Sequence, residues 1–99
     1  MARFTVYRNP NGAGYLLDVQ ANILDHLNTR MVVPLLPLTS APKPAKTLNP
    51  VFDIAGTAVV MVTQFMAAVP TLLLKSPETS MEAQRNEITA ALDLLFQGF

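Results

Sequence analysis

Apolar and polar residues alternate at the start of the chain, in a pattern typical of a half-buried strand. Over residues 3–7, Phe4 and Val6 fall on one face of an extended backbone and polar side chains fall mostly on the other. Residues 9–14 (NPNGAG) contain Asn-Gly, a dipeptide suited to tight turns with positive φ. Residues 15–20 are then expected to return as the second strand of a hairpin.

The middle of the chain predicts four more short strands, which follow an irregular segment or short helical turn at residues 21–29. These strands are expected at residues 30–38, 51–54, 57–63 and 69–75, with the second and third joined across Ala55-Gly56. Pro34 and Pro37 have no N–H to donate, which predicts that their strand lies at a sheet edge or beside bulges. The proline- and lysine-containing residues 39–50 are expected to form an exposed loop.

The C-terminal segment carries the clearest helical pattern. Its apolar stripe consists of Met81, Ile88, Ala91, Leu92, Leu95 and Phe99. The start of this helix has two possible positions. Ser76 can cap a helix whose first residue is Pro77, or Thr79 and Glu82 can form a capping box. Gly98 is placed as the helix stop.

Strands followed by a terminal helix predict one α+β domain over residues 1–99, built on a curled antiparallel sheet. Residues 54–74 contain no charge and are long enough to cross a bilayer as a helix. Pro70 and several polar residues interrupt this run, and its flanks carry no basic cluster, so two buried strands are the better interpretation. Leu94 and Phe96 lie off the helix stripe and predict a second partner surface.

The composition predicts that a partner or a second copy covers some apolar surface, because 51% of residues are hydrophobic and only 14% are charged. Seven basic and seven acidic residues cancel, which gives no electrostatic signature of nucleic-acid binding. The absence of cysteine excludes disulfides and thiolate metal sites and is compatible with a reducing compartment such as the cytoplasm.

Candidate catalytic groups are sparse, which favours a binding protein over an enzyme. The lone histidine, His26, lies in no catalytic motif and is expected to be a solvated loop side chain. No cofactor or metal site is predicted. Asp18 and Arg30 are expected to pin the hairpins rather than to contact a partner. Three methionines are expected to fill gaps in the core: Met31, Met61 and Met66.

Several short motifs, taken in order, resemble the CcdB family, the toxins of type II toxin–antitoxin modules that poison DNA gyrase. They are Asp18-Val19-Gln20, Arg30-Met31-Val32 with Pro34-Leu35, Met66-Ala67 with Val69-Pro70, and finally Phe96 and Gly98. The resemblance covers nearly the whole chain, although the NPNGAG turn and the proline-rich loop do not match the family in detail.

The resemblance implies a small SH3-like barrel with a C-terminal helix, assembled as a homodimer. It also implies a non-enzymatic inhibitor that binds the gyrase A subunit and traps the cleaved-DNA complex, with no direct contact to nucleic acid or membrane. A cognate antitoxin with a disordered C-terminal segment would neutralise it.

Seven positions match gyrase-facing residues of the family: Ile23, Leu24, Asp93, Phe96, Gln97, Gly98 and Phe99. The main departure is Gln97, which stands where the family carries an anchoring tryptophan, and Phe99 replaces a terminal isoleucine. One alternative is therefore a homologue that keeps the dimer and antitoxin binding but has lost or changed its target. Another is an endoribonuclease toxin, which shares the barrel architecture but is disfavoured by the lack of a basic patch and an acid–base pair.

Overall fold

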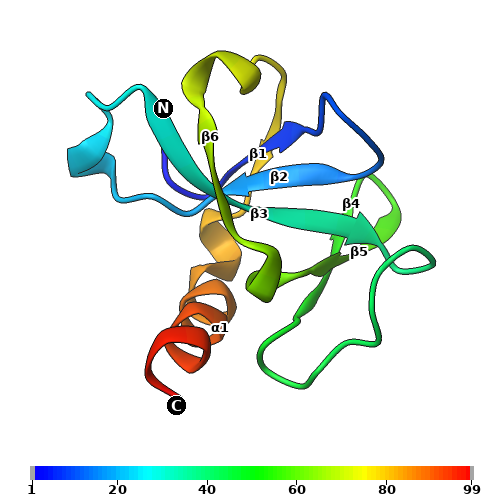
Figure 1. Ribbon diagram of the computed structural model, residues 1–99. Coiled ribbons are helices and arrows are strands. Elements are labelled where there is room, and N and C mark those ends of the chain that lie inside the picture. The colour runs from blue at the N-terminus through cyan, green and yellow to red at the C-terminus, as the bar shows by residue number, and fades with distance from the viewer. Residues whose placement is uncertain (1, 99) are drawn as a thin grey trace.

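The computed structural model describes residues 2–98, which form a curled antiparallel sheet with one helix beneath it (Figure 1). The strands are β1 (Thr5–Arg8), β2 (Tyr15–Asp18), β3 (Thr29–Pro37), β4 (Val51–Ile54), β5 (Thr57–Met61), β6 (Ala67–Pro70) and β7 (Pro77–Ser80). The helix is α1 (Arg85–Gln97), and four 3₁₀ turns are η1 (Asn22–Leu24), η2 (Thr63–Phe65), η3 (Thr71–Leu73) and η4 (Glu82–Gln84). The strand order is β4-β5-β3-β2-β1-β7, with β6 also paired to β3. This confirms the α+β prediction.

β3 lies in the middle of the sheet, so of its two predicted positions, at an edge or beside bulges, the edge position is wrong. One edge of β3 pairs with β2, while the other pairs with β6 over residues 29–32 and with β5 over residues 35–37. Pro34 falls in the gap between these two ladders, where its carbonyl accepts the Val62 N–H at 3.0 Å. The N–H and C=O of one strand residue point to the same edge, so the missing donor of Pro34 faces the gap.

The turns of both hairpins lie where the sequence predicts them, but the positive φ suggested at Asn11-Gly12 is wrong, because in this turn it occurs at Gly14. At the β4–β5 turn, Ala55 and Gly56 both have positive φ (52° and 83°), and Asp53 Oδ1 accepts the Gly56 N–H at 2.9 Å. Gly14, with φ 83°, lies against the backbone of Leu35, where any Cβ would overlap the carbonyl oxygen. The β1–β2 hairpin therefore depends on glycine at this position.

The strand predicted over residues 69–75 is wrong after Pro70. β6 ends there, and the chain turns into η3, where the Thr71 N–H donates to the Asn28 carbonyl at 2.9 Å. The charge-free run at residues 54–74 thus divides into strands and 3₁₀ turns, and β6 is mostly exposed rather than buried. Within residues 2–98, no helix has the length and apolar character needed to cross a membrane.

Both predicted helix starts are also wrong, because residues 77–80 form the edge strand β7, antiparallel to β1. Pro77 begins this strand, a position at which a missing N–H is tolerated. The predicted capping box does not form, and Ser80 Oγ instead accepts the Glu82 N–H at 3.3 Å. The chain passes through η4 before α1 begins at Arg85.

The main core lies between the concave side of the sheet and α1. The helix contributes Ile88, Ala91 and Leu92, which follow the predicted stripe at positions i, i+3 and i+4. Full burial of a side chain such as Ile88 stabilises the fold by roughly 1.5–3 kcal/mol. The predicted methionine fillers are confirmed, because Met61 is fully buried and both Met31 and Met66 pack against the core.

Asp18 and Arg30 pin β2 to β3, as the sequence predicts. Arg30 Nε donates to Asp18 Oδ2 at 2.8 Å and Arg30 Nη2 donates to Asp18 Oδ1 at 2.9 Å. Both side chains are fully buried, and Arg30 Nη2 also reaches the Gln20 carbonyl at 3.2 Å. Burial raises the pKa of the nearby Tyr7 phenol, and the Asp18 charge raises it further.

Candidate target-binding surface

The C-terminal end of α1 presents apolar and polar side chains to solvent. Gly98 adopts φ 81° and its N–H donates to the Leu94 carbonyl at 3.0 Å, which confirms the predicted helix stop. Phe96 is 71% exposed, and Gln97 and Gly98 are also exposed. Phe99, which the sequence also predicts as a contact residue, lies outside the described residues.

The turn η1 presents a second pair of predicted contact residues. Ile23 is 82% exposed and Leu24 is 40% exposed, although both are large and apolar. The Gln20 side chain holds this turn, because its Nε2 donates to the carbonyls of Leu24 (3.3 Å) and Thr29 (3.2 Å). Its Oε1 accepts the Met31 N–H at 3.0 Å, so the turn is tied to β3. A fixed turn that exposes two large apolar side chains is typical of an interaction surface.

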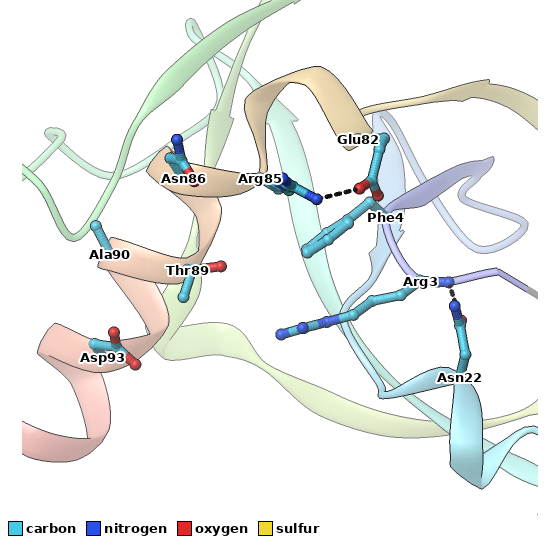
Figure 2. A pocket seen from close by; sticks show the side chains of 9 residues that line it. All are labelled: Arg3, Phe4, Asn22, Glu82, Arg85, Asn86, Thr89, Ala90 and Asp93. Atoms are coloured by element: carbon cyan, nitrogen blue, oxygen red, sulfur yellow. Dashed lines mark hydrogen bonds and ion pairs between the residues drawn. The ribbon is translucent and has the colours of Figure 1, made fainter.

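A cavity of about 660 Å³ lies between η1 and α1 (Figure 2). It is lined by Arg3, Phe4, Asn22, Glu82, Arg85, Asn86, Thr89, Ala90 and Asp93. Asn22 directly precedes Ile23, whereas Asp93 lies one helical turn before Phe96 and Gln97. The cavity therefore lies between the two groups of predicted contact residues. Among the predicted residues that the structure describes, only Asp93 lines it.

Apart from Asp93, the charged residues that line this cavity were not predicted as contacts. Arg3 and Asp93 are 90 positions apart, and no local motif connects them. Arg85 is paired with Glu82 at 3.1 Å, but both side chains are largely exposed (65% and 58%). Such a pair contributes little stability, so these groups remain available to a partner.

A further apolar group lies where η2 meets α1. The turn η2 contacts α1 and exposes Phe65, while Leu95 is partly exposed on the helix. Leu94 is half-buried. Phe65 and Leu95 therefore add exposed apolar surface where η2 contacts α1. The C-terminal end of this helix lies at the bottom of the view in Figure 1.

Groups suited to catalysis or metal binding are few in residues 2–98. His26 is exposed in the loop after η1, as predicted. Within this described part of the chain, no three histidine or carboxylate side chains come close enough to hold a metal ion.

Comparison with solved structures identifies a similar fold. One match is described as "Endoribonuclease in complex with its cognate antitoxin from Mycobacterial species". The TM-score is 0.74 with 20% sequence identity, and the match covers 94% of this chain and 91% of the other. At this identity the likeness establishes the fold alone. The family model described as CcdB protein matches residues 3–98, so the chain belongs to the CcdB family, the toxins of toxin–antitoxin modules.

Proposed function

We propose that this chain is a non-enzymatic toxin that binds the A subunit of DNA gyrase and traps the cleaved-DNA complex. The observation that carries this proposal is the exposure of Phe96, at 71%, on the helix face that adjoins the cavity. Burial of such a ring in an interface contributes roughly 1.5–3 kcal/mol. Ile23 and Leu24, on the other side of the cavity, enlarge the apolar contact.

We further propose that the toxin acts as a homodimer. Phe65 and Leu95 leave apolar surface exposed beside the end of α1, which supports a two-fold contact at this end. A symmetric dimer would present both helix ends together, and a two-fold target could engage them through equivalent contacts. The low fraction of charged residues, 14%, agrees with an additional covered surface.

A cognate antitoxin is the second proposed partner. Membership of the family supports it, and the similar solved structure is that of a toxin bound to its own antitoxin. The antitoxin would contribute a disordered segment that folds on binding. Because gyrase acts on intracellular DNA, the proposed location is the cytoplasm.

The direct experiment is a cleavage assay with purified gyrase, plasmid DNA and the toxin. We expect linear, protein-linked DNA to accumulate with the unaltered chain and to be strongly reduced with Phe96→Ser. Leu72→Ser is the matched control, because Leu72 is equally exposed (77%) but lies outside both the cavity and α1. Gyrase activity that the unaltered toxin leaves unchanged would refute the proposed target.

Two other functions have specific support. Gln97 is exposed at the position where the family tryptophan is expected, which favours a homologue with a lost or altered target. An endoribonuclease is favoured by the name of the similar solved structure. Incubation of the chain with a structured RNA tests the second case, because RNA cleavage would identify an enzyme. Expression in cells tests the first case, because growth arrest without gyrase inhibition or RNA cleavage would indicate a different target.

A further inference from the structure

Arg3 is held firmly on one wall of the cavity between η1 and α1. Its backbone N–H donates to Asn22 Oδ1 at 2.7 Å and its Nε donates to the Val19 carbonyl at 3.0 Å. Its guanidinium carbon lies 4.6 Å from the centroid of the Phe4 ring. Within residues 2–98 the terminal nitrogens Nη1 and Nη2 of Arg3 have no hydrogen-bond partner, and Figure 2 shows them directed across the cavity towards α1.

The backbone of Phe4 supports this placement. Phe4 has φ 71°, a left-handed conformation that bulky residues rarely adopt. Two backbone hydrogen bonds hold it there, from the Phe4 N–H to the Asp18 carbonyl (2.6 Å) and from the Met81 N–H to the Phe4 carbonyl (2.8 Å). A strained residue that its neighbours fix on both sides indicates a functional placement. The Arg3 side chain is therefore positioned before any ligand binds.

Hydrogen-bond donors gather at the Arg3 end of the cavity. Because Asn22 uses its side-chain oxygen to accept the Arg3 N–H, its amide nitrogen remains a donor. Among residues 2–98, Arg3 forms no ion pair, whereas Arg85 forms an exposed one with Glu82. The opposite wall carries Asp93, which also has no ion-pair partner in the described chain.

We propose that this cavity receives one acidic side chain of the bound partner, which pairs with the free edge of Arg3. A guanidinium binds a carboxylate through two parallel hydrogen bonds, and a prepositioned one loses little entropy on binding. Asp93 disfavours a second carboxylate, so the cavity admits a single acidic side chain of the partner. This inference rests on the proposed function, in which the partner is the gyrase A subunit.

The experiment measures binding of the purified toxin to the gyrase A subunit by calorimetry. Arg3→Gln is expected to weaken binding by about tenfold or more, because it removes a charge-assisted contact. Asp93→Asn is expected to tighten binding severalfold, because it removes repulsion from the incoming carboxylate. Arg3→Lys should recover only part of the affinity, since lysine cannot form the paired hydrogen bonds. The weakening by Arg3→Gln should diminish at high salt.

Arg8→Gln is the matched control, because Arg8 pairs with Glu78 outside this cavity and is 67% exposed. Its affinity should equal that of the unaltered chain, and far-ultraviolet circular dichroism should be the same for all variants. Unchanged affinity of Arg3→Gln would overturn the inference but leave gyrase as the target. Weaker binding by Asp93→Asn would overturn selection of a single acid. No binding by the unaltered toxin would overturn the proposed target and this inference together.

Discussion

Replacement of Asp18 by asparagine tests how far the buried ion pair holds the sheet together. The substitution keeps the shape of the side chain but removes its charge and one acceptor. Arg30 would remain buried without a counter-ion, since both side chains are 0% exposed. Arg30 Nη1 already has no hydrogen-bond partner within the described residues, so the guanidinium has little alternative compensation.

The expected magnitude follows from the burial of both partners. Breaking a buried pair from one side typically destabilises a protein by about 3–5 kcal/mol. For a domain of this size each kcal/mol lowers the melting temperature by roughly 4–8 °C, so the expected decrease exceeds about 12 °C. Total stability of small domains is about 5–15 kcal/mol, and Asp18→Asn should therefore leave a marginally stable protein.

The assay is urea unfolding followed by circular dichroism, with the free energy of unfolding obtained by linear extrapolation. Glu82→Gln serves as control, because its pair with Arg85 is exposed and should contribute less than about 1 kcal/mol. The double variant Asp18→Leu, Arg30→Met should recover most of the lost stability, because no unpaired charge remains buried. A loss below about 1 kcal/mol for Asp18→Asn would refute the argument that Arg30 depends on this carboxylate.

Four further substitutions have directional outcomes. Because burial raises the pKa of Tyr7, the phenol keeps its proton to higher pH in the folded protein than in the unfolded chain. Stability should therefore fall as the pH rises above about 10. Tyr7→Phe should flatten this decline in pH-dependent melting curves. Gly14→Ala should destabilise the protein by more than about 2 kcal/mol in urea unfolding, because the new Cβ would overlap the Leu35 carbonyl. At Gly98 a new Cβ meets no neighbour, so Gly98→Ala should destabilise the protein by only about 1–2 kcal/mol, through its left-handed φ. Equal losses for the two variants would contradict this distinction. Gln97→Trp should tighten gyrase binding about thirtyfold, and unchanged affinity would show that position 97 is no anchor.

The parts of the fold that were predictable from sequence depend on local periodicity. The α1 stripe and the β1–β2 turn follow from spacing within a few residues. The helix start was not predictable in this way, because residues 77–80 become a strand only by pairing with β1. The central position of β3 was not predictable either, because it depends on pairing with β5 and β6, which follow later in the chain.

The candidate surface was predictable only as separate pieces. Exposure of Ile23 and Phe96 agrees with their predicted partner-facing role, although their role itself stays a prediction. The cavity between them requires Arg3 and Asp93 to face each other across the fold, which no local pattern indicates. The left-handed Phe4 carried no sequence signal either, since glycine or asparagine is the usual residue in that conformation.

The pairing of β1 with β7 has a consequence for synthesis of the protein. Arg8 and Glu78 meet across this pair at 2.7 Å, although they are separated by 70 positions. During synthesis β1 must therefore wait with one edge unpaired until β7 emerges. Because α1 follows β7, the sheet and the exposed helix end are completed almost together. Chains that end before β7 should consequently be accessible to proteases, because β1 lacks its second partner.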